Sequence, residues 1–533
     1  MKLLTIYRTI LYFLLVLAMI IPSGCEKSIT EPDPEIPDPP IEIKFDAVLH
    51  ASKLSVAIPR EWTEDIIITA LDENVKPENF SAASGNTGIA TVTQSENTLT
   101  ITGIDYGKTS VTITSNSGKR IEIPVNIYNH RILETDELLI TYSDDFERRY
   151  ARPALSFWHP KRTTDGFKPV GSLYIGGTSN PSGKQGIMML KAKEGSDALA
   201  PPTGFSRILH MRQWNVDDEG SAWIPIAPPG YVALGIVVAP GGDAPSLDDV
   251  VTVRKDLTIP AEAGRKLVYI TDRATRLGSQ RHYAVWEIIP PHSAHIHENA
   301  YLPAGTFVYR YDENKEPDKP SAHPVMHVLN VHLPMLTEPA SFDEYRPRMT
   351  SYDEPPHETV PVLAREMLVP STILNDPHYS TSERILHSPF YRLERQIYYE
   401  VLMHGHNDTE LVQHFNETVK YGISQTESQE IWVETGIDIS FSGGISIKMV
   451  EAGRNVTLSL KLGYKSLTSV TEFHEKSYTA HLSVPPGKAA TLFHRYSRFV
   501  LKRHNENTKS FEVVKIWDVS NQSYHHAQYP PHD

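Results

Sequence analysis

Cysteine is almost absent from this 533-residue chain, since Cys25 is the only one. A single thiol excludes a disulfide within one copy and excludes zinc sites built from several cysteines. After residue 24, no apolar run reaches the roughly 20 residues that a membrane-spanning helix needs. The G-x-S-x-G elbow, the glycine-rich phosphate loop and the H-E-x-x-H helix are also missing. We therefore expect a protein that is not an enzyme and that needs no cofactor.

Positive charge is also scarce, because 51 basic residues face 65 acidic ones and the formal charge is −14. Removal of residues 1–24 would take away Lys2 and Arg8 and bring the charge to −16. Nucleic acid is a polyanion, so we expect no nucleic-acid partner. Hydrophobic residues at 40% and charged residues at 22% fit a folded, water-exposed body.

The first 24 residues have the pattern of an export signal. Lys2 and Arg8 precede an apolar run over residues 9–21, and Pro22-Ser-Gly separates this run from Cys25. A basic start, about a dozen apolar residues and a small-residue ending are typical of a cleaved signal and not of a spanning helix. The sequence predicts a signal peptide over residues 1–24.

Cys25 after Ser-Gly resembles the lipobox of bacterial lipoproteins, in which the thiol carries lipid and becomes the mature N-terminus. Two or more acyl chains anchor a protein stably. Residues 25–42 are rich in proline and acid, which predicts a stiff, solvated linker. Acidic residues behind such a cysteine also resemble the surface-export signal of Bacteroidetes lipoproteins. We expect an outer-membrane lipoprotein on the cell surface, held to the membrane through Cys25.

Residues 43–130 alternate between apolar and polar positions in short runs, which predicts a small β-sandwich. Gly88-Ile-Ala-Thr-Val and Val111-Thr-Ile-Thr resemble motifs of bacterial Ig-like domains, which mostly act as spacers. The predicted strands are residues 54–58, 66–70, 90–93, 98–102, 110–114 and 121–125.

A proline- and glycine-punctuated stretch begins at Trp223. It reads W-I-P-I-A-P-P-G-Y-V-A-L-G, then P-S-L-D-D-V from Pro245 and V-R-K-D-L-T from Val253. These three motifs, in this order, resemble the core of the Vps62-related family, also known as a plant domain of unknown function. Asp248 and Pro245 are expected to organise a turn. The resemblance covers residues 137–312 and implies no settled activity.

Weaker copies of this motif flank it, with Trp158 and Trp286 lying 65 and 63 residues from Trp223. That period fits three repeated units of short strands. The fold expected for residues 137–312 is a pseudo-threefold, β-prism-like domain. Repeated aromatic residues more often pack than bind, so we expect the three tryptophans to be structural anchors.

Residues 313–395 show little periodicity and are rich in proline, histidine and acid, which predicts a connecting region with a short helix near residues 360–367. A connection of that length also indicates that some strands in it go unrecognised. Long alternating strands return in residues 396–533.

Two runs in that part predict an amphipathic hairpin. Residues 437–449 and 456–465 alternate strictly around a turn at residues 451–455. Strands of about ten alternating residues are typical of transmembrane β-barrels, but they also fit a static sandwich. The candidate insertion residues are Ile437, Ile439, Phe441, Ile445, Ile447, Val456, Leu458, Leu460 and Leu462.

Residues 477–493, with the break Val484-Pro-Pro-Gly-Lys, resemble the strand that follows the insertion hairpin in aerolysin-type pore-forming proteins. The resemblance implies an elongated antiparallel β module over residues 396–533. It also implies a homo-oligomer on membranes.

Histidine is the residue type that could still hold a metal. His292, His295 and His297 have a spacing that could serve zinc, but alternation on a strand would put His292 on the opposite face from the other two. The carboxylate pairs Asp144-Asp145 and Asp217-Asp218 stand in turn-like sequence and are expected to be solvated. We expect no metal site.

Three hypotheses follow from the sequence. In the first, an all-β surface lipoprotein binds a glycan or membrane component through the repeat domain and forms a β-barrel pore through the C-terminal module. In the second, the same protein only binds. The third, a metal-dependent hydrolase built on histidines, lacks a recognisable site.

Overall fold

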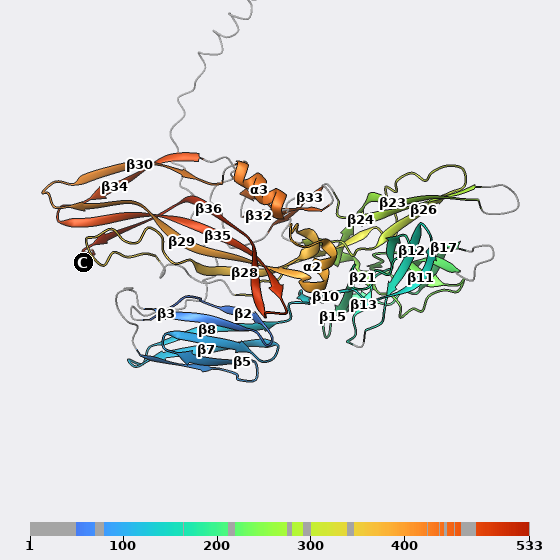
Figure 1. Ribbon diagram of the computed structural model, residues 1–533, viewed down its shortest axis with the longest axis horizontal. Coiled ribbons are helices and arrows are strands. Elements are labelled where there is room, and N and C mark those ends of the chain that lie inside the picture. The colour runs from blue at the N-terminus through green and yellow to red at the C-terminus, as the bar shows by residue number, and fades with distance from the viewer. Residues whose placement is uncertain are drawn as a thin grey trace, which may run out of the picture. The chain divides into compact units, whose positions relative to one another are not determined.

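The structure is a computed structural model, and the contacts divide the chain at Pro40 into a short first unit and a second unit, Ile41–Asp533. All described residues belong to the second unit. There, nearly all regular structure is β-strand (Figure 1), which confirms the all-β prediction. The described residues are 49–69, 79–163, 165–211, 219–273, 280–291, 300–337, 346–423, 425–435, 437–441, 445–451, 454–459 and 476–531.

The N-terminal strands pair into two sheets of four strands each. They are β1 (His50–Ala51), β2 (Val56–Pro59), β3 (Thr63–Thr69), β4 (Phe80–Ser84), β5 (Ala90–Ser95), β6 (Thr98–Gly103), β7 (Gly107–Ser115) and β8 (Arg120–Tyr128). The sheet orders are β1-β3-β6-β5 and β2-β8-β7-β4. Alternation builds the core between them, since Leu99 and Ile101 of β6 are buried and the threonines beside them are half-buried. The short β1 and the Ser/Ala-rich β4 lie outside the predicted strands.

Three repeated units follow. The first contains β9 (Leu133–Glu134), β10 (Leu138–Ser143), β11 (Phe146–Arg152), β12 (Leu155–Pro160), β13 (Lys168–Pro169), β14 (Leu173–Gly176) and β15 (Ile187–Ala192). The second contains β16 (Leu199–Ala200), β17 (Gly204–Met211), β18 (Gly220–Ile226), β19 (Tyr231–Val232), β20 (Val237–Pro240) and β21 (Thr252–Arg254). After η1 (Lys255–Leu257), the third contains β22 (Thr258–Pro260), β23 (Glu262–Arg273), β24 (Gln280–Ile289), β25 (Ala300–Leu302), β26 (Phe307–Asp312) and β27 (His327–Val331).

Each unit contributes two sheets, and one of them has its tryptophan on the central strand. The tryptophan sheets are β11-β12-β14, β17-β18-β20 and β23-β24-β26. The companion sheets are β13-β15-β10-β9, β16-β21-β19 and β22-β27-β25. The backbone therefore has the pseudo-threefold organisation that the tryptophan spacing predicts.

The third unit extends past the predicted boundary at residue 312. Its strand β27 pairs with both β22 and β25, so it completes the companion sheet of that unit. The predicted boundary was placed too early because the proline- and acid-rich loop after β26 hides the return of alternation.

The short helix predicted near residues 360–367 is wrong. This segment belongs to strand β28 (Val362–Pro370), in which all residues except Arg365 are buried. A strand that is buried on both faces gives a nearly continuous apolar run, and such a run cannot be distinguished from a helix by periodicity.

A sheet of long strands, with the order β28-β29-β35-β36, dominates the C-terminal part. Its other members are β29 (Phe390–Asn407), β35 (Lys488–Asn505) and β36 (Ser510–Tyr529). Between β28 and β29 lie η3 (Ser371–Ile373) and α2 (Thr381–His387), whose N-terminus is closed by a capping box of Ser380 and Glu383. The sheet thus begins before residue 396, since the first residues of β29 are buried on both faces and show no alternation.

A second group of C-terminal elements follows β29. It comprises β30 (Gln413–Tyr421), α3 (Gln425–Thr435), β31 (Ile437–Phe441), β32 (Ile445–Glu451), β33 (Arg454–Ser459) and β34 (Lys476–Val484). Strands β30 and β34 form a two-stranded ribbon, and β31-β32-β33 form a separate meander. One apolar core includes Tyr128 from β8, Leu329 from β27 and Phe499 from β35, so it joins the sandwich, the repeats and the long sheet.

Candidate functional site

The segment between β30 and β34 leaves the two-stranded ribbon of these strands and returns to the same end of it. Tyr421, the last residue of β30, pairs with Lys476, the first residue of β34. Residues 422–475, which contain α3 and the β31–β33 meander, therefore form an excursion at one end of a ribbon. A loop with neighbouring ends can change conformation without moving the strands that flank it.

The backbone register brings the apolar positions of the meander together. Ile439 pairs with Ile447, and Ile447 pairs in turn with Leu458. Because side chains alternate along a strand, positions paired in this way share one face of the sheet. The candidate residues on these strands are Ile437, Ile439, Phe441, Ile445, Ile447, Val456 and Leu458, whereas Leu460 and Leu462 lie outside the described residues.

The first arm of the predicted hairpin differs from the structure. Residues 437–449 are divided between β31 and β32, which pair with each other antiparallel, so the run forms a hairpin and not one strand. Gly443 and Gly444, which come between these strands in the sequence, lie outside the described residues. The predicted turn after Glu451 is present, because β32 pairs with β33 from Glu451 and Arg454 onward.

Helix α3 connects the excursion to the body. Lys515 Nζ of β36 lies 2.5 Å from Glu434 Oε2, and the backbone N–H of Asn375 donates to the carbonyl of Thr435 over 2.9 Å. Ile431 is buried in the apolar core. The meander itself lies beside β25 of the third repeat and beside η3. The excursion is thus stowed against the body through α3, β32 and β33.

The Pro485-Pro486-Gly487 motif forms the turn that separates β34 from β35. Gly487 has a φ of 68°, a conformation that other residues rarely adopt, and its N–H donates to the carbonyl of Asn407 over 2.8 Å. The Asn407 side chain is fully buried and donates to the carbonyls of Leu411 and Val484. This turn moves the chain from the ribbon into the long sheet.

In the repeats, the register gives the three tryptophans equivalent places. Each stands between a basic residue on the preceding strand and an aliphatic residue on the following one, and each preceding strand shifts register directly after the basic residue. The three rows are Arg148-Trp158-Leu173, Arg207-Trp223-Val237 and Lys266-Trp286-Val308. The tryptophans are buried, with 7%, 8% and 3% of their surface exposed.

Each of the three units has a glycine at an equivalent position, and those of the first two units lie against each other. Gly171, Gly235 and Gly305 each stand two residues before the last strand of their tryptophan sheet. A Cβ on Gly171 would lie 2.8 Å from Thr306 Cγ2, and a Cβ on Gly235 would lie 2.6 Å from Thr306 Cβ. Such distances leave no room for a side chain, which explains the glycine that ends the Y-V-A-L-G motif.

The P-S-L-D-D-V motif forms a turn, but Asp249 and not Asp248 organises it. The Asp249 carboxylate accepts from the N–H of Ser246 over 3.1 Å and from Arg162 over 2.7 Å. Its carbonyl lies 3.0 Å from Nε2 of the buried His159. Two adjacent aspartates cannot be told apart in the sequence, since only the fold decides which one faces the turn.

The V-R-K-D-L-T motif contributes an ion-pair cluster on the surface. Arg254 contacts the carboxylates of Glu137, Asp197 and Asp256. Glu137 precedes β10 of the first repeat, so Arg254 links the first two units. These contacts raise the pKa of Arg254, chiefly through the hydrogen bond to Asp256. Both motifs therefore have structural roles.

A buried charged cluster lies in the long sheet near the sandwich, and nothing in the sequence pattern indicates it. Arg392 of β29 lies 2.5 Å from Glu366 and 2.9 Å from Glu394, and Lys502 lies 2.6 Å from Glu394. Burial raises the pKa of Glu366 to about 7 although Arg392 opposes the shift. Burial would also raise the pKa of Glu394, but Arg392 and Lys502 hold it below its usual value.

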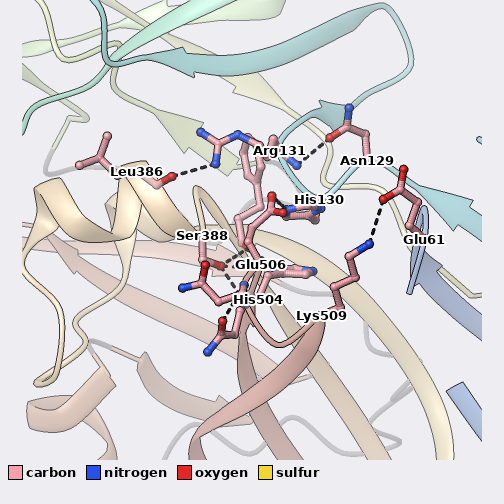
Figure 2. Close-up of polar contacts among 12 residues, drawn as sticks. Glu61, Asn129, His130, Arg131, Leu386, Ser388, His504, Glu506 and Lys509 are labelled. Atoms are coloured by element: carbon pink, nitrogen blue, oxygen red, sulfur yellow. Dashed lines mark hydrogen bonds and ion pairs between the residues drawn. The ribbon is translucent and has the colours of Figure 1, made fainter. Parts of the chain in front are cut away.

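Two histidines, one from each side of the body, stack on each other near Arg392 of this cluster. Figure 2 shows His130 and His504 with the polar contacts around them. The rings of His130, which follows β8, and His504, at the end of β35, lie 5.0 Å apart at 27°. The Trp62 ring lies 5.7 Å from each of them, and Phe511 packs against Trp62 and His504. We call Trp62, Tyr128, His130, His504 and Phe511 the histidine junction.

Hydrogen bonds and ion pairs surround the junction. His130 Nε2 lies 2.6 Å from Glu506 Oε1, and Lys509 Nζ lies 2.9 Å from Glu61 Oε2. Arg131 donates to the carbonyl of Leu386, the next-to-last residue of α2, over 2.8 Å. Figure 2 shows these contacts reaching from the sandwich side to the C-terminal side.

Within the described residues, the other predicted features do not come together into a metal-binding site. Among these residues, no group of three metal-ligating side chains comes together. The segment with His292, His295 and His297 lies outside the described residues, as do Asp217, Asp218 and Cys25. None of the described helices combines the length and apolar composition of a membrane span.

The repeats are the part of the chain that matches a known family. Residues 132–346 match the model for "Vacuolar protein sorting-associated protein 62". This region is Vps62-like. The match confirms the resemblance seen in the motifs from Trp223 to Thr258, and it extends past residue 312, in agreement with the position of β27. No curated protein matches the chain.

Solved structures show partial similarity. GNIP1Aa from Chromobacterium piscinae aligns at 17% identity and a TM-score of 0.28, over 36% of this chain and 35% of that one. The match thus spans about a third of GNIP1Aa. Cry35Ab1 aligns at 14% identity and a TM-score of 0.31, over 75% of this chain and 91% of that one. Domains 4 and 5 of the S-layer protein SbsC align at 28% identity and a TM-score of 0.14, over 15% of this chain and 44% of that one.

Proposed function

We propose that this chain is a non-enzymatic surface lipoprotein with two working parts. The Vps62-like region binds a glycan or a membrane component, and the excursion over residues 422–475 enters membranes and forms a β-barrel pore in a homo-oligomer. Cys25 carries the lipid anchor in the outer membrane, and an Ig-like sandwich separates the anchor from the working parts.

One observation carries the proposal, namely the pairing of Tyr421 with Lys476 at the base of the excursion. Directly after this pair, the N–H of Gly422 donates to the carbonyl of Ser520 over 3.2 Å, so the β30–β34 ladder could continue toward α3 once this bridge opens. The added strands would carry the apolar positions of β31–β33 on one face. Alternation over about ten residues suits a strand of a membrane barrel.

Insertion requires the excursion to leave its place on the body. Its polar contacts there include the Glu434–Lys515 ion pair, the Asn375–Thr435 hydrogen bond and the bridge between Gly422 and Ser520. An exposed ion pair contributes only about 0 to 1 kcal/mol. The burial of Ile431 adds an apolar contact that unwinding of α3 would lose. Binding of the Vps62-like region to a membrane component would bring the excursion to the surface where it can insert.

A cross-link tests this proposal. In a Cys25→Ser background, Glu434→Cys and Lys515→Cys joined by a short bismaleimide would hold α3 against β36. We expect dye release from liposomes by the parent chain and loss of that release after cross-linking. A matched control joins Arg498→Cys to Asp518→Cys, a pair across β35 and β36 that has no reason to separate.

Leakage that persists with α3 held in place would exclude the excursion as the inserting element. Absence of leakage in the parent on vesicles of outer-membrane lipids would favour the alternative, a lipoprotein that only binds. The alternation of β31–β33 is compatible with that alternative, in which the meander is a fixed cover over β25 and η3.

A further inference from the structure

His504 has hydrogen bonds that specify one neutral tautomer. Its Nδ1 lies 3.0 Å from the carbonyl oxygen of Phe390, which can only accept, so Nδ1 carries the proton. Its Nε2 lies 2.8 Å from the Tyr128 hydroxyl, which must then donate. Arg392 hydrogen-bonds the same tyrosine oxygen. A proton on Nε2 would compete with the tyrosine hydrogen, so the closed junction suits a neutral ring.

The groups around His504 also disfavour a positive charge on its ring. The His130 ring stacks on His504, and Arg392 lies 4.3 Å from the Phe511 ring that contacts His504. Protonation of both histidines would place two new cations near a guanidinium where both rings are buried. Like charges at such distances repel strongly where the surroundings are apolar.

We propose that the histidine junction is an acid-sensitive contact, which closes the sandwich onto the ends of β35 and β36 at neutral pH and opens when His130 and His504 take up protons. The junction links Trp62 and Tyr128 of the sandwich to His504 and Phe511 of the long sheet. The opening is independent of the membrane insertion proposed above.

The charged groups around the pair determine the direction of the effect. Glu506 faces His130 and favours its protonation, whereas Arg131 opposes it. On the far side of β35, Arg503 is already paired with Asp376 and Glu512. The titratable and charged groups that face the junction from all packed elements are Lys53, Glu61, Tyr128, Arg131, Glu366, Arg392, Glu394, Lys502, Arg503, Glu506 and Lys509.

The pKa shifts of both histidines also favour opening of the junction at low pH. Burial lowers the pKa of His130 below 6.5 although Glu506 opposes the shift. Burial, together with His130 and Arg392, holds the pKa of His504 well below 6.5. A group whose pKa is lower in the closed state binds its proton more readily in the open state. Closure is therefore complete above pH 6.5 and weakens as the pH falls below this value.

Hydrogen–deuterium exchange of the full chain from pH 7.5 to 5.0, corrected for the chemical exchange rate, tests the proposal. We expect peptides over residues 57–62 and 502–512 to lose protection, by up to about tenfold per pH unit for each proton taken up. Peptides over the tryptophan strands β12, β18 and β24 should stay protected over the same range.

Two variants should move the opening in opposite directions. Glu506→Gln removes the carboxylate that favours a charged His130 in the closed state, so opening should occur at higher pH. His130→Gln removes one of the two protonation sites, so opening should require lower pH. Glu506 is half exposed, which makes misfolding of its variant a small concern. The matched control is His414→Gln, at an exposed histidine of β30, and it should leave the profile unchanged.

Protection of residues 57–62 and 502–512 that stays constant down to pH 5.0 would overturn the proposal. If the parent and both variants lost protection at the same pH midpoint, the role of the histidines would be overturned. Simultaneous loss of protection in β12, β18 and β24 would show global acid unfolding and would overturn a local contact.

Discussion

Gly235 of the second repeat lies directly against Thr306 of the third, so that a Cβ on this glycine would lie 2.6 Å from the threonine Cβ. The Thr306 hydroxyl donates to the carbonyl of Leu234, which fixes the threonine in place. Close packing at the convergence of three units therefore requires the absence of a side chain at this position.

Gly235→Ala should destabilise the Vps62-like region by about 1–3 kcal/mol, because the added methyl group overpacks a site that cannot relax. Chemical denaturation would measure the loss. Gly204→Ala is the matched control, since a Cβ there would meet its nearest neighbour at 3.8 Å. Equal stability of the two variants would contradict the packing argument.

Replacement of Trp158, Trp223 or Trp286 by alanine should cost roughly 3–5 kcal/mol at each position, since each removes a large buried side chain from an equivalent row. Replacement by phenylalanine should distinguish the three positions. Trp158 and Trp223 donate to the hydroxyls of Ser156 and Ser221 over 2.8 Å. Trp286 has Ala284 at the corresponding position, so Trp286→Phe should cost less than Trp223→Phe. A tryptophan that alanine replaces without loss of thermal stability would break the equivalence.

Leu458→Arg should abolish the proposed permeabilisation, because a cation on the lipid face of a barrel strand costs about 2–4 kcal/mol near the midplane. Thr457→Arg is the control on the opposite face, where it pairs in register with Lys448. It should alter conductance and leave insertion intact. In a static fold, neither parent nor variant releases dye, and Leu458→Arg only lowers stability.

Glu366→Gln should change the pH dependence of stability in the long sheet. The pKa of Glu366 is raised to about 7 by burial, so the folded state holds the proton more tightly than the unfolded state does. The contribution of the protonated carboxyl is complete below the unfolded pKa of about 4.5 and is lost as the pH rises through 7.

Relative to Glu366→Gln, the parent should therefore lose up to about 3 kcal/mol between pH 4.5 and 8. Urea denaturation of both proteins at several pH values would measure the difference, with Glu417→Gln, an exposed position on β30, as control. A constant difference across this range would show that Glu366 keeps one charge state.

Cys25→Ala should leave the chain unprocessed or free of the membrane, since the proposed anchor is the lipid on this thiol. Fractionation and metabolic palmitate labelling would follow the change. Label that persists in the variant would locate the lipid elsewhere.

The repeats could be predicted from the sequence because their signal is local. Tryptophan recurs at a period close to the length of one structural unit, at Trp158, Trp223 and Trp286. Prolines and glycines, which mark turns, are frequent after Trp223. Alternation likewise revealed most strands of the sandwich. Such signals depend only on neighbours along the chain.

The buried centre of the C-terminal part could not be predicted in this way. Strand β28 is apolar on both faces, so its period disappears. The run from Arg392 to Arg395 reads as a solvated strand, yet all four residues are buried. Arg392 pairs there with Glu366, and Glu394 pairs with Lys502. His130 and His504 meet across most of the chain length, and no spacing rule connects them.

The pairing at the two ends of residues 422–475 also has a consequence for the evolution of the chain. Because Tyr421 and Lys476 are neighbours, the segment between them can be replaced by another without moving the positions where it begins and ends. Exchange, lengthening or loss of that segment in a single recombination event would leave the β30–β34 ladder intact. Natural variation among related chains should therefore accumulate between these two residues, while the strands that flank them stay constant in length.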